Sequence, residues 1–374
     1  MPSDVLIIGG GVIGCSIAWR VSQAGLSVTL IEKGRIGCEA SRAAAGMLSP
    51  QGESQSPGPF FDLCLRSRAL YKDVTQELFD VSGVDSEYKD EGTLAVVFDH
   101  ENLEERTAWA RWQLDAGLPL EYVSAAELRK LEPAVAESAA TAIFLPQEHQ
   151  IENRRLMDAL EIAIRNAGVQ ILEGTEVISI IREADRVTGI ETTKGRIAGG
   201  TVIVAAGTWS SALLQPLGLD ANVVPARGQM VAVKSDVCPI TRVLHSHSVY
   251  VVPRRDGRIL IGATVEHAGF KKAVTVAAVN TLLKAALDLV PTLADSEIIE
   301  TWCGLRPDTA DHLPILGFGG PENLLLATGH YRNGILLAPV TANLLTETVT
   351  SNREPAEFRD FSVTRFRREI AYAG

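Results

Sequence analysis

The stretch that decides the fold is Val5–Gly14, which reads "VLIIGGGVIG". Its first four residues, Val5–Ile8, form a continuous apolar run that is typical of a strand buried on both faces of a parallel sheet. The glycines that follow have the spacing G-x-G-x-x-G between Gly9 and Gly14. The residues Val12–Ala24 then carry a helical pattern that ends at a further glycine. The sequence therefore predicts a strand, a tight turn and a helix in immediate succession.

The glycine spacing indicates a site for the pyrophosphate of a dinucleotide. The first glycine allows the tight turn, the second lets backbone approach the phosphates, and the third lets helix and strand pack closely. The start of the helix then offers free N–H groups and the positive end of its dipole. A second apolar run, Val28–Ile31, ends at Glu32, where a carboxylate can accept hydrogen bonds from a ribose. A glycine turn in an ordinary α/β fold would leave this acid unexplained. The candidate dinucleotide residues here are Gly9, Gly11, Val12, Ile13, Gly14, Glu32 and Lys33.

Composition and charge exclude several other classes of protein. The chain has 374 residues and a net charge of −11, without a block of basic residues, so nucleic acid is not an expected partner. Its five cysteines include no C-x-x-C pair, which argues against a disulfide framework and a structural zinc site, and no metal is expected. The N-terminus lacks the basic region of a signal peptide, and no apolar run reaches the roughly 20 residues of a membrane helix. We therefore expect a cytoplasmic protein without integral membrane association.

The remaining segments predict a two-domain organisation in which the dinucleotide domain is discontinuous. Buried strands are predicted at Thr201–Gly207 and Asn323–Gly329, and alternating strands at Val169–Ile197 and Val223–Thr264. Helices are predicted at Phe61–Val81, Asn102–Ala116, Asn153–Asn166, Val274–Leu289 and Ile335–Val349, with a capping box at Ser124–Glu127. We assign residues 1–82, 150–222 and 300–374 to the dinucleotide domain, and residues 83–149 and 223–299 to a substrate domain.

Four motifs beyond the glycine turn carry a resemblance to a known family. They are "ASRAAAGML" (residues 40–48), "VIVAAGTWS" (202–210), "GLRP" (304–307) and "HYRNGILLAP" (330–339). With these motifs the chain resembles, over its whole length, the D-amino-acid oxidase family of flavoproteins. The resemblance implies an α/β fold with an α+β second domain. The first domain would be Rossmann-like, FAD-binding and of the glutathione-reductase type, and the substrate domain would contain a mainly antiparallel sheet.

The resemblance also implies which residues hold FAD. Small residues of the first motif would let backbone wrap the pyrophosphate and the flavin, and the last motif would point helix N–H groups at the cofactor. The residues implied are Ala40, Ser41, Ala45, Gly46, Met47, Val177, Ala206, Gly207, Gly304, His330, Arg332, Asn333, Gly334, Ile335 and Leu336. A packed helix start is the alternative interpretation of Ala43–Ala45. The glycine turn by itself does not distinguish FAD from NAD.

Arg306 stands in "GLRP" between apolar residues, and a guanidinium keeps its charge and must find water or an anion. Its rigid fork of donors suits a carboxylate, and the resemblance implies that Arg306 clamps the carboxylate of an amino-acid substrate. A local salt bridge to Asp308 or Asp311 is the alternative. The resemblance also places Tyr250 and Arg332 in the catalytic site. A core strand position is the alternative for Tyr250, and a solvated loop charge is the alternative for Arg332.

Within the family the motifs are most similar to the glycine oxidases that serve thiamine biosynthesis. This implies oxidation of glycine, sarcosine or small D-amino acids by hydride transfer to flavin N5, with molecular oxygen as electron acceptor, and a homotetramer or other homo-oligomer. Open alternatives are a dehydrogenase with another acceptor, an NAD-dependent enzyme and a non-catalytic dinucleotide-binding subunit. Cys303 precedes "GLRP", and it is interpreted as a small buried residue, with covalent attachment of flavin as the alternative.

Overall fold

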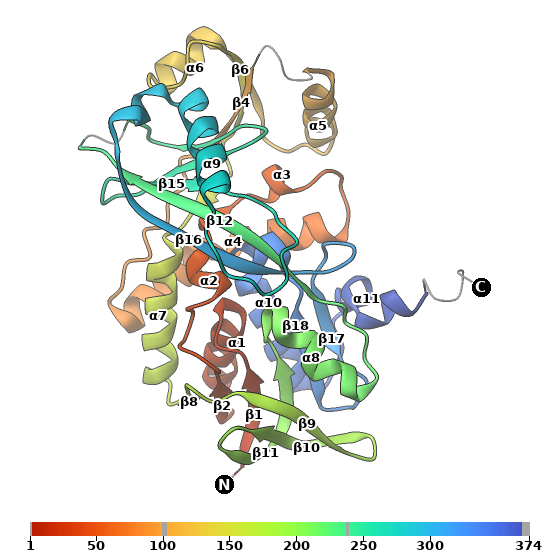
Figure 1. The fold of residues 1–374 in the computed structure, drawn as a ribbon. Coiled ribbons are helices and arrows are strands. Elements are labelled where there is room, and N and C mark those ends of the chain that lie inside the picture. The colour runs from red at the N-terminus through yellow and green to blue at the C-terminus, as the bar shows by residue number, and fades with distance from the viewer. Residues whose placement is uncertain (1, 99–102, 237–238, 369–374) are drawn as a thin grey trace.

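The computed structural model describes residues 2–98, 103–236 and 239–368, and it arranges them in two eight-stranded sheets and one two-stranded sheet (Figure 1). The main path of the first sheet has the order β17-β18-β11-β1-β2-β8, and β9 and β10 continue it beyond β11. The second sheet has the order β16-β12-β15-β14-β13-β4-β6-β5. Its strand pairs are antiparallel except for β13 with β4. The predicted α/β class with a mainly antiparallel second sheet is confirmed.

The first sheet is built from the apolar runs that the sequence predicts as buried strands. Its strands are β1 (Ser3–Ile8), β2 (Val28–Ile31), β8 (Gln170–Leu172), β11 (Gly195–Val204), β17 (Ile315–Phe318) and β18 (Leu324–Thr328), with β9 (Val177–Glu183) and β10 (Arg186–Thr192) as a hairpin. Five of these strands, β8, β2, β1, β11 and β18, pair with one another in parallel in that order, whereas β17 is antiparallel to β18 and β10 is antiparallel to β11. Ile8 lies opposite both Ile31 and Val204, so these strands end together where the glycine turn begins.

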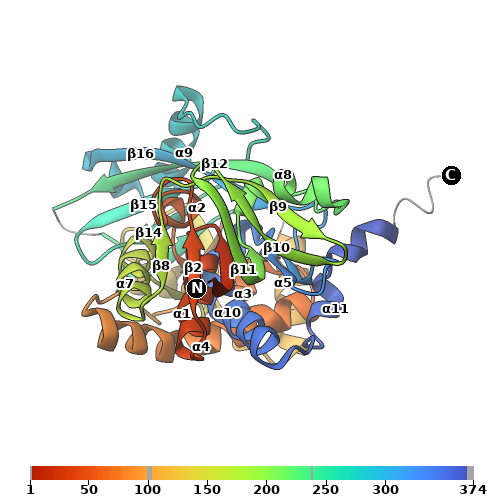
Figure 2. The same ribbon diagram turned by 90° about the horizontal axis from the view of Figure 1, so that it is seen from below.

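Both faces of the first sheet are covered, which explains why its strands are apolar throughout. Val5 and Ile7 pack against four helices, whereas Leu6 and Ile8 pack against the β9–β10 hairpin and α8 (Ser210–Leu214). Figure 2 shows the four helices grouped on one side of the sheet. They are α1 (Val12–Gln23), α4 (Pro59–Ser82), α7 (Asn153–Asn166) and α10 (Gly334–Ser351). Their bounds agree with the sequence prediction to within two residues at each end.

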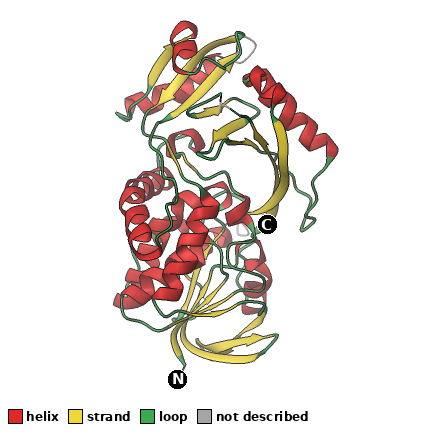
Figure 3. Cartoon of the chain, turned by 90° about the vertical axis from the view of Figure 1, so that its left-hand side faces the viewer, coloured by secondary structure: helices red, strands yellow, loops and turns green. Residues whose placement is uncertain are grey.

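The second sheet lies at the opposite end of the molecule, as the side view shows (Figure 3). Its strands are β4 (Thr93–Phe98), β5 (Glu121–Ser124), β6 (Ala139–Leu145), β12 (Val224–Lys234), β13 (Val243–His245), β14 (Tyr250–Pro253), β15 (Arg258–Gly262) and β16 (Glu297–Asp308). Helix α9 (Val276–Leu289) contributes Leu282, Ala286 and Leu289 to the core of this sheet. Helix α6 (Ala125–Leu131) begins with the predicted capping box between Ser124 and Glu127. Helix α5 spans Leu103–Asp115, and Asn102, where its start is predicted, lies outside the described residues.

Short elements connect the two sheets beside the glycine turn. They are α2 (Ala40–Ala43), β3 (Met47–Leu48), α3 (Pro50–Glu53) and β7 (His149–Gln150). Strands β12 and β16 pair along their length, from Val224 with Asp308 to Lys234 with Glu297. The domain boundary predicted between residues 299 and 300 falls inside β16, so residues 300–308 belong to the second sheet, and the rest of the domain division stays a prediction. Among the described residues, none of the helices is both long enough and apolar enough to span a membrane.

Candidate cofactor and substrate site

A cavity of about 540 Å³ lies where the first sheet, the short connecting elements and the β12–β16 ladder meet. Its walls come from the start of α1, the end of β2, residues 39–49, strands β12, β14 and β16, and the start of α10. This volume is in the range of small-molecule and cofactor pockets. The cavity therefore collects residues from both sheets that are far apart in the sequence.

The glycine turn forms one wall of the cavity. Gly9 has φ +109°, and a Cβ on it would lie 2.8 Å from the carbonyl carbon of Ala205. A Cβ on Gly14 would overlap the carbonyl oxygen of Gly9, so this glycine lets the helix pack against the turn. Gly11 lines the cavity, and a Cβ there would meet only the Ser41 hydroxyl, at 3.2 Å. The turn thus leaves room for a ligand against backbone at the start of α1, which carries the positive end of the helix dipole.

Glu32 is fixed at the end of β2 by two backbone groups. Its Oε2 accepts from the N–H of Gly10 at 2.7 Å, and its Oε1 accepts from the N–H of Gly34 at 2.7 Å. The neighbouring Lys33 places its Nζ 3.2 Å from the centre of the Trp209 ring, and burial lowers the pKa of Lys33. Glu32, Lys33 and Trp209 line the cavity together with Val177, Ala206 and Gly207.

The segment around α2 is held from outside, so that its small residues face the cavity. The Ser41 hydroxyl accepts from the N–H of Val12 at 2.9 Å, which joins the segment to the glycine turn. The carbonyl of Ala45 accepts from Nη2 of the buried Arg254 at 2.6 Å. Arg254 in turn lies 3.0 Å from the carboxylate of Glu152, also buried, and burial lowers the pKa of Arg254 while Glu152 opposes this shift. The inner surface includes the predicted residues Ala40, Ser41, Ala45, Gly46 and Met47, together with Glu39, Ala43 and Ala44.

The turn before α10 forms another part of the cavity wall. His330, Arg332, Asn333, Gly334 and Ile335 all line it, and no side chain caps the N-terminus of this helix. Burial lowers the pKa of His330 to about 3, so its imidazole is neutral near pH 7, and its Nε2 lies 3.2 Å from the Thr341 hydroxyl. The start of α10 therefore presents backbone dipoles, and His330 adds no charge.

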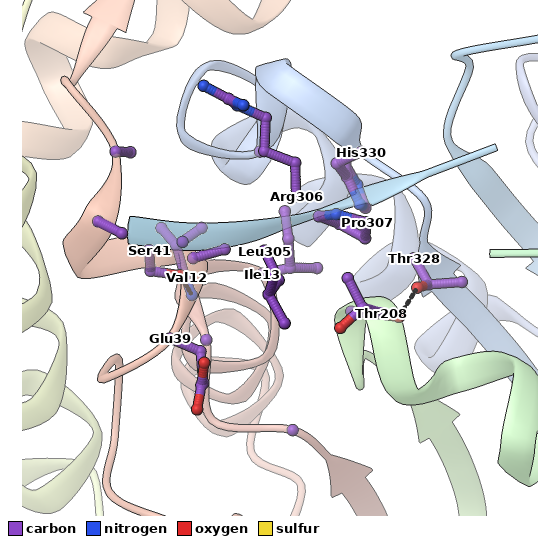
Figure 4. Close-up of a pocket in the computed structure, with 18 of the residues that line it drawn as sticks. Val12, Ile13, Glu39, Ser41, Thr208, Leu305, Arg306, Pro307, Thr328 and His330 are labelled. Carbon is purple, nitrogen blue, oxygen red and sulfur yellow. Dashed lines mark hydrogen bonds between the residues drawn. The ribbon is translucent and has the colours of Figure 1, made fainter. Parts of the chain in front are cut away.

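Arg306 projects from β16 into the cavity without a carboxylate partner. Figure 4 shows its side chain leaving the strand on the side away from Val12 and Ile13. Its Nη1 donates to the carbonyl of Thr264 at 3.0 Å. Within the part of the chain that the structure describes, no Asp or Glu forms an ion pair with Arg306. The local salt bridge considered above is not formed.

The two aspartates that could have paired with Arg306 have other partners. Asp308 lies 2.6 Å from Nδ1 of His312, and Asp311 lies 2.7 Å from Nε of Arg365. Both aspartates therefore have partners other than Arg306.

Tyr250 lies at the start of β14, buried beside the two arginines of the site. Its hydroxyl donates to Sδ of Met230 at 3.4 Å. Burial raises the pKa of Tyr250, and the charges of Arg306 and Arg332 oppose that shift. The tyrosine is thus a neutral hydrogen-bonding group on an otherwise apolar wall, which also includes Ala45, Met47 and Ala263.

Arg332 is exposed to solvent, as a loop charge would be, but it is paired with a carboxylate. Its Nη2 forms an ion pair with Oε1 of Glu53 at 2.9 Å, and Glu53 raises the pKa of Arg332. Both side chains line the cavity. Glu53 was not among the sequence candidates, because in "PQGESQSPG" it resembles any acid of a polar loop.

The cavity brings together most, but not all, of the predicted site residues. Gly14 and Leu336 do not line it. Gly14 lies behind Gly9, and Leu336 is buried in the helical core, so its placement does not favour the predicted cofactor contact. Cys303 does not line the cavity either. Sequence reasoning missed several residues that do, and besides Glu53 they include Ser49, Thr208, Trp209, Met230 and Tyr331.

These features fit a flavin dinucleotide in the cavity. Two helix N-termini, of α1 and α10, face it from the same edge of the first sheet, where the parallel strands β1 and β18 end, and each favours negative charge on a ligand. Gly11 leaves its backbone accessible, and Glu32 stands at the end of β2 where a ribose would lie. Among the described residues, no three His, Cys, Asp or Glu side chains are grouped as metal ligands would be.

Comparisons with known proteins agree with this geometry. A model of the family described as FAD-dependent oxidoreductase (DAO) matches residues 4–348. The bifunctional protein ThiO/ThiG of Synechocystis sp. is 38% identical over 373 residues, which cover 97% of this chain and 54% of that protein. The chain thus spans about half the length of this relative and of two similar ones.

Two shorter proteins match over nearly their whole length. A glycine oxidase of Pseudomonas aeruginosa is 37% identical over 357 residues, which cover 95% of this chain and 96% of that protein. The crystal structure of a glycine oxidase from Geobacillus kaustophilus matches with a TM-score of 0.94 and 35% identity, covering 97% of this chain and 99% of the other. The family resemblance predicted from the motifs is confirmed.

Proposed function

Because this chain belongs to the DAO family of FAD-dependent oxidoreductases, we propose that it is an amino-acid oxidase that deaminates glycine. Sarcosine and small D-amino acids would be further substrates. The products are glyoxylate or another 2-oxo acid, ammonia or an amine, and hydrogen peroxide formed from molecular oxygen. Bound FAD supplies the two-electron acceptor for the hydride that leaves the substrate Cα.

The observation that carries this proposal is the state of Arg306. It is an arginine in a cavity, its neighbours Asp308 and Asp311 are paired elsewhere, and its hydrogen bond to the carbonyl of Thr264 uses one of five N–H donors. The remaining donors can bind both oxygens of a carboxylate. A binding module without a substrate would have no use for such a group.

The walls around Arg306 favour the reactive form of a small amino acid. Tyr250 can donate its hydroxyl to the bound carboxylate, because its pKa is raised and it stays neutral. Met47, Met230 and Ala263 present apolar surface, which disfavours a charged ammonium group, and the nearby arginines act in the same direction. The protein thus favours the neutral amine, whose lone pair can assist loss of hydride from Cα, and it orients the substrate.

The residues that would hold FAD follow from the cavity wall. The start of α1, with Gly11, Val12 and Ile13, suits the pyrophosphate, and Glu32 suits the adenosine ribose. The segment from Ala40 to Met47 and the start of α10 would enclose the remainder. Cys303 lies outside the cavity wall, which supports noncovalent binding.

The decisive experiment is peroxide release by the FAD-loaded protein in air, with glycine, sarcosine, D-alanine, D-proline and L-alanine as substrates. We expect glycine to lead, with sarcosine and small D-amino acids behind it and L-alanine inactive. Silence in air together with rapid reduction of an artificial dye would instead identify a dehydrogenase. Silence under both conditions would contradict the substrate class.

The ThiO/ThiG relatives suggest that the activity serves thiamine biosynthesis, and we include this role in the proposal. Cytoplasmic location and a homo-oligomeric state stay predictions from the sequence and the family resemblance.

A further inference from the structure

The ion pair between Glu53 and Arg332 lies inside the proposed substrate pocket and is not used by the mechanism above. Its two atoms, Oε1 and Nη2, are 2.9 Å apart, and the side chains of Glu53 and Arg332 are 17% and 34% exposed. Tyr250 and Arg306 line the same cavity, and the charge of Glu53 reaches Tyr250 as well as Arg332. A carboxylate of the protein therefore lines the same cavity as Arg306, the group proposed to bind the substrate carboxylate.

The two arginines that line this pocket differ in whether a carboxylate of the protein is paired with them. Arg306 has no carboxylate partner within the described chain, whereas Arg332 is neutralised by Glu53. The three groups together leave one positive charge, and it resides on Arg306. This balance matches a ligand that carries a single negative charge.

Glu53 is held in position by the packing of its short helix. At the start of α3, the N–H of Gln51 donates to Oε1 of the fully buried Glu148 at 2.7 Å. The Gln51 side chain donates to Gln113 at 3.0 Å and to the carbonyl of Pro119 at 3.2 Å. Just beyond α3, the indole N–H of Trp109 donates to the carbonyl of Ser54 at 3.2 Å. The helix is thus tied on both sides of Glu53.

We propose that Glu53 is a specificity-determining residue, which occupies Arg332 and so restricts the pocket to amino acids with one anionic group. Substrates with a second anionic group, such as iminodiacetate or D-aspartate, would meet the Glu53 carboxylate where they need a cation. Repulsion between like charges and the loss of a charge-assisted partner both act against them. The inference rests on the proposed function, because it concerns selectivity at that same substrate site.

A binding measurement tests the charge balance without turnover. Acetate and malonate carry one and two carboxylates and have no amine to oxidise, so calorimetry on the FAD-loaded protein reports their affinities directly. We expect the unmodified protein to prefer acetate. Glu53→Gln should raise the ratio of malonate to acetate affinity by roughly tenfold or more, since it frees Arg332 for a charge-assisted bond. An unchanged ratio would overturn the proposal.

Two further variants keep the test decisive if Glu53→Gln folds poorly. Glu53→Asp retains the charge and should keep the original preference for acetate. Arg332→Gln leaves Glu53 without its cation, so it should weaken malonate binding more than acetate binding; a gain for malonate would contradict the proposal. In the double variant, the gain produced by Glu53→Gln should disappear, because Arg332 is the group that it frees.

A matched control is Glu357→Gln, which removes a partly exposed carboxylate that is paired with Arg66 and does not line the cavity. It should leave both affinities unchanged.

Turnover then separates this inference from the proposed function. With Glu53→Gln, kcat/KM for iminodiacetate relative to glycine should rise in parallel with the binding ratio. If the binding ratio shifts and neither amine is oxidised by any variant, the selectivity role stands and the proposed activity is wrong. If glycine is oxidised and neither ratio shifts, the activity stands and the role of Glu53 is wrong.

Discussion

The guanidinium of Arg306 lies against the bare backbone of Gly228 on the neighbouring strand, where a Cβ would come within 2.5 Å of the Arg306 Cζ. Ala226 is the residue directly opposite Arg306, so the arginine reaches diagonally across the β12–β16 ladder. The absence of a side chain at residue 228 is therefore what lets Arg306 adopt this position.

Gly228→Ala should displace Arg306 while the fold persists, because the atoms in the way belong to the far end of a flexible side chain. We expect KM for glycine to rise by roughly tenfold to a hundredfold, as small misplacements of a positioning group can cost. Steady-state kinetics measure the change in KM, and a thermal melt shows whether the fold persists. Gly52→Ala is a matched control, since its added Cβ would make only an ordinary contact, at 3.6 Å from the Cβ of Ser49. A normal KM in Gly228→Ala would show that Arg306 tolerates displacement.

Arg306→Lys tests the carboxylate clamp itself. A lysine keeps the charge but cannot offer two parallel N–H donors, so KM for glycine should rise by about tenfold or more. The flavin absorbance spectrum and FAD content should remain normal. An unchanged KM would remove Arg306 from the carboxylate site.

Much of the fold and of this site could be predicted from the sequence, because the residues concerned act through local pattern. Val5–Gly14 specifies strand, turn and helix by periodicity and by glycines whose Cβ atoms would collide with backbone. Arg306 stands out because a lone arginine among apolar residues requires an explanation. These local patterns can be recognised in the sequence without knowing which distant segments of the chain come into contact.

Glu53 and Gly228 could not be predicted, because their roles arise only when distant segments meet. Glu53 matters through an ion pair with Arg332, 279 positions later, and nothing in its own segment marks it. Gly228 matters because β12 lies beside β16, a pairing set by the sheet and not by a motif. The predicted domain boundary between residues 299 and 300 falls inside β16 for the same reason. The residues of this strand do not by themselves indicate to which of the two sheets it belongs.

Glu32→Ala should weaken retention of FAD before it alters the chemical step. The variant removes the carboxylate expected at the ribose and also two hydrogen bonds from Gly10 and Gly34, so the turn should lose some stability as well. Flavin fluorescence in the filtrate after ultrafiltration measures the retention. Activity at saturating added FAD should be nearly normal, and full retention would show that Glu32 does not hold the ribose.

Glu148 should make stability fall as pH rises. Burial raises the pKa of this carboxyl to about 7 from its ordinary 4.5, so the folded state binds the proton more tightly than the unfolded chain. This contribution is fully present below about pH 4.5 and is lost as pH rises through about 7, by up to about 3 kcal/mol. Glu148→Gln removes the titration. The thermal midpoint of the variant relative to the unmodified protein should therefore be higher at pH 8 than at pH 5, and parallel pH profiles would contradict the assignment.

Cys303 should play no part in holding the cofactor. It does not line the cavity, so denaturation should release all flavin from the polypeptide, and Cys303→Ser should retain a normal FAD content. Acid precipitation followed by absorbance of the supernatant checks the first point. Flavin that remains with the precipitated chain would establish a covalent bond.

The cavity wall has a consequence for how the protein is made. Gly9, near the start of the chain, and Ile335, near its end, both line the cavity, and β18, which completes the parallel part of the first sheet, spans residues 324–328. A ribosome that has released only the first half of the chain has exposed the glycine turn and Glu32, but neither the Arg306 strand nor the helix that closes the pocket. Capture of the cofactor is therefore a late event in biosynthesis, and until then the apolar strands of the first sheet must be shielded by the nascent chain itself or by chaperones.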